Sequence, residues 1–277
     1  MAACALPLAG CQDEPKAPPL NTLKPKPLPQ VVMTPADVDA GSDIERREAL
    51  FRVQQVPVYG DEVPKDAVRI ELKGEAVTIA GQPFDPTKPD AAAAVRQRIP
   101  EGRPALIAPD ADTFLAQAAP LFAALDVARV PTYLLHPSGR VAFRVTLSDE
   151  HDFQNWLDNP RPAAVGRIRI IHRADGYELQ TSIGKLPGGD PNGPSVPRRG
   201  GQWDLARLRG ALGALKGRFS TDEESCIVPS FGMELSAVAT TLTGYYTADG
   251  ERYFDALCLV YPRPVTKADA GSPAPKQ

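Results

Sequence analysis

The feature that most constrains the fold of this chain is an order of elements that occurs twice. In each copy a β-hairpin precedes a helix, a strand, a second helix and another strand. β-Branched residues around a glycine turn indicate the hairpins, and apolar residues at helical spacing indicate the helices. Strands joined through a helix pair in parallel, so both copies are expected to contain parallel strand pairs.

These patterns assign the elements of the two copies. The first copy is expected to contain a hairpin at 67–72 and 76–79, a helix at 90–98, a strand at 104–108, a helix at 112–126, strands at 130–135 and 141–145, and a helix that carries Phe153, Trp156 and Leu157. The second copy is expected to contain a hairpin at 167–172 and 177–181, a helix at 203–217, a strand at 226–229, a helix at 233–243 and a strand at 254–260.

A short pattern recurs at the same place in both copies, in the segments Leu106-Ile-Ala-Pro-Asp-Ala-Asp-Thr-Phe-Leu-Ala and Cys226-Ile-Val-Pro-Ser-Phe-Gly-Met-Glu-Leu-Ser. In each, an apolar strand ends at proline, a polar stretch follows, and a helix begins. We therefore predict a mixed α/β (α+β) fold of two tandem β-β-α-β-α-β units, each a small mixed sheet with helices on one face. Asp110 and Asp112 are interpreted as caps of the helix that follows, rather than as an acid–base pair.

Composition limits the classes of function. The 277 residues give room for two domains, and 31 basic against 34 acidic residues give a net charge of −3. A charge so close to zero does not draw a protein to nucleic acid or to anionic lipid. No run approaches ~18 uninterrupted apolar residues, so no transmembrane helix is expected.

Residues 8–11, Leu-Ala-Gly-Cys, resemble the lipobox of bacterial lipoproteins. The resemblance implies that residues 1–10 are a signal peptide and that Cys11 carries the lipid anchor. Because residues 1–10 are short and hold no lysine or arginine, translation is expected to begin upstream. Gln12 stands where inner-membrane lipoproteins tend to have aspartate, which favours the outer membrane and a periplasm-facing protein. The alternative is a cytosolic protein with a chance cysteine.

The regions around the two copies have the composition of linkers. Residues 11–41 are rich in proline and poor in large apolar groups, which indicates a disordered tether. A capping box at Ser42 opens a helix to about residue 55. Residues 265–277 are expected to form a disordered tail. The two predicted folded units are therefore residues 42–160 and 161–264.

Two cysteines remain in the folded part once the leader is removed, Cys226 and Cys258. In an oxidising compartment such a pair is a candidate disulfide. The alternative is two buried thiols that pack as small apolar groups.

The order of elements, with the phrase Ala105-Leu-Ile-Ala-Pro-Asp-Ala-Asp-Thr-Phe before a helix, resembles the periplasmic domain of the ExbD/TolR biopolymer-transport family. The resemblance covers residues 66–136 and, more loosely, 166–261. It implies domains that are not enzymes and that contact peptidoglycan or envelope proteins. Since relatives dimerise through these domains, it also implies an intrachain pseudo-dimer. The family's transmembrane helix with its proton-linked aspartate has no counterpart here, so proton coupling is not carried over.

A second resemblance points to another fold. Residues 129–145 are similar to the strand–turn–strand that follows the cis-proline of thioredoxin-like proteins, which would make Pro131 that cis residue. Thioredoxin redox chemistry requires a Cys-x-x-Cys pair, and the sequence has none. The alternative function is thus a thioredoxin-like envelope protein without redox activity.

The long Gly/Pro-rich loop at 184–201 is the candidate partner-binding segment. It lacks the Gly-Lys-Ser/Thr ending of a phosphate-binding loop, and its prolines remove the amides that such a loop would use. The simplest interpretation is a long connecting loop, and its length inside a compact unit makes a binding role the alternative. The candidate contact residues are Lys185, Asp190, Asn192, Arg198 and Arg199.

No constellation in the sequence points to catalysis, and no cofactor is expected. His136, His151 and His172 have no metal-ligand spacing and are interpreted as surface or turn residues. Trp156 and Trp203 are interpreted as core anchors. The function predicted is that of a non-enzymatic, lipid-anchored scaffold of the cell envelope, an accessory of a Tol/Exb-type transport system.

Overall fold

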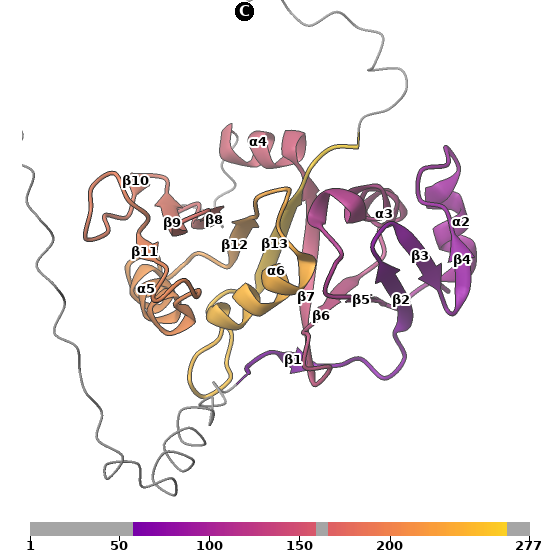
Figure 1. Ribbon diagram of the computed structural model, residues 1–277, viewed down its shortest axis with the longest axis horizontal. Helices are drawn as coiled ribbons and strands as arrows, with labels where there is room; N and C mark the ends of the chain where they lie inside the picture. The colour runs from indigo at the N-terminus through magenta and orange to yellow at the C-terminus, as the bar shows by residue number, and fades with distance from the viewer. Residues whose placement is uncertain (1–57, 159–165, 265–277) are drawn as a thin grey trace, which may run out of the picture. The chain divides into compact units, whose positions relative to one another are not determined.

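The computed structural model describes residues 58–158 and 166–264, the N-terminal and C-terminal halves below. They build one mixed sheet of 13 strands with helices packed on it (Figure 1). The mixed α/β class predicted from the sequence is confirmed. The predicted Cys11 anchor, signal peptide, tether, helix at 42–55 and C-terminal tail lie outside the described residues.

The helices and strands fall close to the predicted positions. The strands are β1 Asp61–Glu62, β2 Val68–Lys73, β3 Ala76–Ile79, β4 Gln82–Phe84, β5 Ala105–Pro109, β6 Thr132–Leu135, β7 Val141–Asp149, β8 Arg169–Arg173, β9 Gly176–Thr181, β10 Gly184–Lys185, β11 Val196–Pro197, β12 Glu224–Val228 and β13 Ala256–Tyr261. The helices are α2 Ala91–Arg98, α3 Leu115–Ala128, α4 Glu150–Asp158, α5 Leu205–Arg218 and α6 Leu235–Leu242, and a 3₁₀ turn, η2, spans Thr243–Tyr245. The short strands β1, β4, β10 and β11 were not predicted.

The strand order is β10-β9-β8-β12-β13-β7-β6-β5-β2-β3-β4. The expected parallel pairs are present: β2 with β5 and β5 with β6 in the first half, β8 with β12 and β12 with β13 in the second. The two halves join because β13 also pairs in parallel with the end of β7. The described residues therefore share one continuous sheet.

The buried side chains divide between the two faces of this sheet. Successive strand residues point to opposite faces. In β13, Leu257, Leu259 and Tyr261 enter the main core beneath α2, α3, α5 and α6, and Cys258 and Val260 pack on the other face with α4. The two aromatic rings of α4, Phe153 and Trp156, cover this smaller cluster.

Cys226 and Cys258 occupy paired positions of β12 and β13. The structure joins them by a disulfide, with their Cα atoms 4.3 Å apart. Trp156 packs over this cluster and donates a hydrogen bond from its indole nitrogen to Glu224 Oε2 at 2.9 Å. The cystine thus lies in a small apolar core of its own.

The amino ends of α3 and α6 meet in a reciprocal backbone contact, the α3–α6 junction (residues 113–116 and 231–235). Leu115 N donates to Met233 O at 2.9 Å, and Leu235 N donates to Thr113 O at 2.8 Å. Phe114 and Glu234 form an antiparallel bridge between these two bonds. Each partner lies 120 positions from its counterpart, the same offset that relates the two recurring segments of the sequence.

Asp61 connects β1 to the C-terminal half. Its carboxylate accepts hydrogen bonds from Tyr246 Oη and Arg252 Nε, both at 2.9 Å, and from the backbone nitrogen of Arg144 at 3.1 Å. Asp61 and Arg252 are also an ion pair, with only about a fifth of each side chain exposed. Because β1 itself pairs with β7, this carboxylate holds the start of the described chain to both halves.

Two local predictions are wrong. The described residues contain no cis peptide bond, so Pro131 is trans. Its carbonyl accepts a hydrogen bond from Ala105 N at 2.8 Å and extends the β5–β6 ladder. Helix α3 begins at Leu115 rather than 112, because Asp110 holds the preceding turn by accepting from Thr113 Oγ1 at 2.5 Å and from Asp112 N at 3.2 Å.

The Asp61 contacts predict a stability effect. Replacing Asp61 by alanine leaves Arg252 and Tyr246 Oη without their acceptor in a half-buried site, so the free energy of unfolding should fall by about 2–3 kcal/mol. Chemical denaturation measures this. Glu62→Ala, on the same strand and exposed, is the matched control and should change it by less than about 0.5 kcal/mol. Equal effects of the two variants would contradict the assignment.

The cystine predicts a second effect. Closing the chain between Cys226 and Cys258 should stabilise the fold by about 3–4 kcal/mol in the chain-entropy model, since the loop restricts the unfolded state. Urea unfolding of the oxidised and the reduced protein gives this difference. The Cys226→Ala, Cys258→Ala double variant, compared with the reduced protein, measures the separate cost of lost packing. Two titratable thiols in the unreduced, denatured chain would show that the bridge does not form.

Candidate functional site

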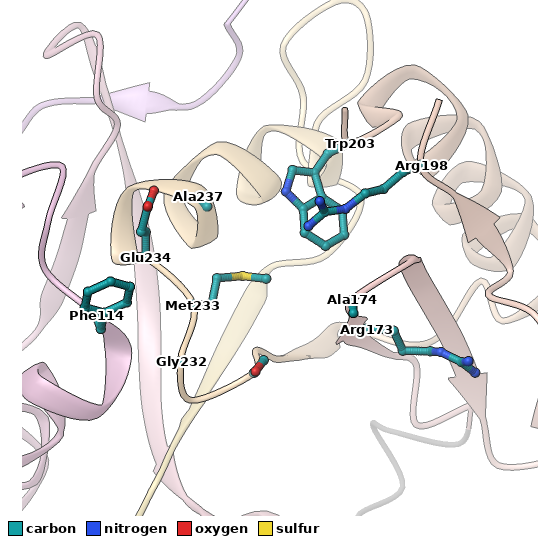
Figure 2. A pocket seen from close by; sticks show the side chains of 10 residues that line it. Phe114, Arg173, Ala174, Arg198, Trp203, Gly232, Met233, Glu234 and Ala237 are labelled. Carbon is teal, nitrogen blue, oxygen red and sulfur yellow. The ribbon is translucent and has the colours of Figure 1, made fainter. Parts of the chain in front are cut away.

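A pocket of about 360 Å³ opens between the β8–β9 turn, the segment after β11 and the α3–α6 junction (Figure 2). Most of its lining comes from the C-terminal half, and Phe114 comes from the N-terminal half. The lining residues are Phe114, Arg173, Ala174, Arg198, Trp203, Ser230, Gly232, Met233, Glu234 and Ala237.

The wall formed by Trp203 is a stack of aromatic rings and one cation. The guanidinium of Arg198 lies over the indole, 3.9 Å from the ring centroid. On the indole's inner side Tyr177 stacks at a centroid distance of 4.7 Å, with the ring planes 30° apart. A cation this close to an indole gains a cation–π attraction and a fixed plane. Arg198 is thus held in position although its side chain is exposed.

The backbone that positions Arg198 is fixed by the edge of the sheet. β11 pairs with the start of β9, Val196 opposite Tyr177 and Pro197 opposite Gly176, and the next amide, Arg198 N, donates to Asp175 O at 2.9 Å. An added Cβ at Gly176 would overlap the Val196 carbonyl oxygen. Only glycine therefore allows this close approach of β11.

The rest of the predicted loop is also held by strand pairing and hydrogen bonds. β10 pairs with the end of β9, and Ser195 Oγ donates to Leu186 O at 2.5 Å and accepts from Leu179 N at 3.1 Å. A Cβ at Gly188 would overlap the Pro194 carbonyl. The segment covers the edge of β9, and its glycines allow the backbone to pack closely there.

The structure separates the five candidate loop residues. Lys185 Nζ donates to Pro191 O at 3.3 Å and to Gly193 O at 2.5 Å, and Asp190 accepts from Asn192 N at 2.9 Å. These three residues stabilise the loop itself. Arg199 exchanges backbone hydrogen bonds with Gln202 and does not line the pocket. Arg198 alone among the five lines it.

Arg173 has its charge engaged elsewhere. Its guanidinium pairs with Glu178 at 2.9 Å and with Asp175 at 3.1 Å. The hydrogen bond to Glu178 is the main cause that raises the pKa of Arg173. Its side chain points away from the pocket in Figure 2. Within the described part of the chain the Arg198 guanidinium has no hydrogen-bond or ion-pair partner, so Arg198 is the cation available to a ligand.

His172 lies behind the stack and is buried, which corrects its assignment to the surface. Its ring is 5.3 Å from that of Trp203, and its Nε2 lies 3.1 Å from Thr241 Oγ1. Burial, and secondarily the charge of Arg198, lower the pKa of His172 to about 3. His136 is also buried, with Nδ1 2.9 Å from Ser138 Oγ, and His151 is exposed as expected.

Sequence reasoning named two of the residues that matter here, in separate roles. Arg198 was predicted as a contact residue of the binding loop, and Trp203 was predicted as a core anchor. The contribution of Phe114, Met233 and Glu234 was missed, since it depends on the α3–α6 junction. The burial of His172 did have a signal in the sequence, because His172 alternates with the buried residues Ile170, also in β8, and Ile168, just before it.

The pocket combines one free cation with aromatic and thioether surface. In the described ranges no group of three or more histidine, cysteine, aspartate or glutamate side chains could hold a metal ion. None of the helices at 58–158 and 166–264 is long and apolar enough to cross a membrane.

Comparison with known proteins finds no matching family model, no matching curated protein and no matching solved structure.

The burial of His172 predicts a pH dependence. Between its unfolded pKa of 6.5 and its folded pKa of about 3, only the unfolded chain is protonated at this ring. Stability is therefore lost as the pH falls, with a slope that approaches about 1.4 kcal/mol per pH unit. Denaturation of the wild type between about pH 6.5 and 5 measures it, before most carboxylates titrate.

His172→Gln should remove most of this slope, and the exposed His151→Gln is the matched control that should retain it. The remaining slope belongs to His136, whose pKa burial also lowers. A slope that is the same in wild type and His172→Gln would contradict the assignment.

Proposed function

We propose that this chain is a non-enzymatic, lipid-anchored binding protein of the cell envelope, built from two tandem ExbD/TolR-like β-β-α-β-α-β units. The observation that supports this most is the strand order. The first half has β3-β2-β5-β6 and the second has β9-β8-β12-β13, with helices at the same two crossovers. Hairpin, helix, strand, helix and strand thus follow the same path in both.

The α3–α6 junction supports the pairing of the units. Its two hydrogen bonds, Leu115 N to Met233 O and Leu235 N to Thr113 O, are equivalent under exchange of the halves. Reciprocal contacts of this kind are typical of a two-fold interface between equal subunits. One chain with two linked units would therefore be an intrachain pseudo-dimer, with the pocket beside its pseudo-axis as the binding site.

The envelope location rests on the sequence at Cys11. A lipid at this residue would hold the binding unit at the membrane through residues 12–57. The partner would be another envelope protein or peptidoglycan, and the protein an accessory of a Tol/Exb-type transport system. Attachment of the partner at a free cation and aromatic surface requires no catalytic group.

Lipid attachment is tested by growing cells with an alkyne fatty acid and labelling the tagged protein. We expect the wild type and the Cys4→Ser variant to carry the label and to be found in the membrane fraction, since Cys4 leaves with the leader. Cys11→Ser should lose both. A label that persists in Cys11→Ser, or is absent from the wild type, would overturn the anchor. Crosslinking of the labelled envelopes then identifies motor subunits or peptidoglycan as the partner.

A further inference from the structure

We propose that the Trp203 pocket binds an internal acidic peptide segment of a protein partner, with an aspartate or glutamate on Arg198 and a neighbouring large apolar side chain against Trp203 and Met233. This proposal rests on the proposed function, because it specifies the chemistry of the partner that the binding protein would recognise. Two pockets of the chain differ in the chemistry of their linings.

A second pocket, of about 700 Å³, lies in the N-terminal half. Each pocket is formed between the end of a hairpin and the first turns of a crossover helix. Gln117 of α3 lines one and Ala237 of α6 lines the other, again 120 positions apart. The two pockets therefore share this one equivalent position, and the rest of their linings comes from different places in the two halves.

Their chemistry differs. The N-terminal pocket is lined by alanine, valine, proline and phenylalanine with acidic and neutral polar residues, and it has no lysine or arginine. The Trp203 pocket has Arg198 and Trp203, both supplied by the segment between β9 and α5. The connection between β3 and α2, at 80–90, is much shorter. The longer connection thus supplies a cation and an indole to the pocket of the C-terminal half.

Arg198 is suited to a carboxylate. A guanidinium presents a planar fork of N–H donors that matches the two oxygens of a carboxylate. Its plane is already held by the indole, so little side-chain entropy is lost when a ligand binds. The neighbouring Arg173 is neutralised by Glu178 and Asp175, which leaves a single anion position.

The apolar part of the ligand follows from the surface around Arg198. In the apolar lining of the pocket, Phe114 is 38% exposed, and Met233 and Trp203 are half-buried. Aromatic and methionine side chains around one cation are typical of the centre of a protein-binding site. Glu234 lies across the pocket from Arg198 in Figure 2 and disfavours a second carboxylate there.

The shape favours a peptide over a free small molecule. The exposed residues Ala174, Gly232 and Glu234 border the pocket, so it is open to solvent. Sites for small molecules bury most of the ligand. A space of about 360 Å³ that is open on one side holds one or two side chains of a segment that runs across it.

The test uses the full-length chain and two pools of N-acetylated, C-amidated heptapeptides. In one pool the central residue is aspartate or glutamate, and in the other it is asparagine or glutamine; leucine, phenylalanine and methionine vary at the flanking positions in both. Peptides retained by the immobilised protein are identified by mass spectrometry, and affinities of the enriched peptides are measured by fluorescence anisotropy.

We expect the acidic pool to be enriched over the amide pool. The enriched peptides should bind Arg198→Gln at least about tenfold more weakly, the loss of one charge-assisted pair. Arg199→Gln is the matched control, an exposed arginine one position away that does not line the pocket, and should bind like the wild type. Added salt should weaken binding to the wild type.

Equal retention of the two pools, or equal loss in Arg198→Gln and Arg199→Gln, would overturn the proposal. Circular dichroism of each variant establishes that it is folded. Purified protein binds or fails to bind these peptides whether or not it carries lipid. Failure here is therefore distinguishable from failure of the Cys11 labelling experiment.

Discussion

The parallel pairing of β13 with β7 is the interaction on which the rest of this structure depends. Four residue pairs, from Cys258 with Thr146 to Tyr261 with Asp149, join the sheets of the two halves. β7 has nine residues and uses both of its edges: β6 pairs at 142–145 along one, and β13 pairs at 146–149 along the other. Shortening β7 would leave two sheet edges without partners.

The β7 edge also explains the position of Asp61. β1 pairs with β7 at 141–142 and β13 pairs with it at 146–149, along the same edge. The chain that enters at β1 and the loop that leads into β13 are thus neighbours, and Asp61 binds Arg252 and Tyr246 of that loop. A force applied to the chain ahead of β1 would therefore act on both halves together and would not separate one half from the other.

Much of the fold could be predicted because its signals are local. Periodicity and turn residues located both hairpins and the described helices. Pairings between distant residues have no such signal. The β7–β13 ladder, the α3–α6 junction and the two-residue strand β11 each depend on where another segment already lies. Pro131 was taken for a cis residue from a short resemblance, although its carbonyl is needed in an ordinary ladder.

The candidate site likewise combines residues that the sequence could identify with contacts that it could not. A cation and a tryptophan in one Gly/Pro-rich stretch could be named from the sequence, but their stacking requires β11 to return to β9. That return also fixes what lies behind them. His172 is buried within 5.3 Å of Trp203, and a charged imidazole there would repel Arg198 and compete with it for an anion. Because burial keeps the pKa of His172 at about 3, the ring stays neutral at ordinary pH. The positive charge of the pocket is therefore confined to its exposed side, where a ligand can reach it.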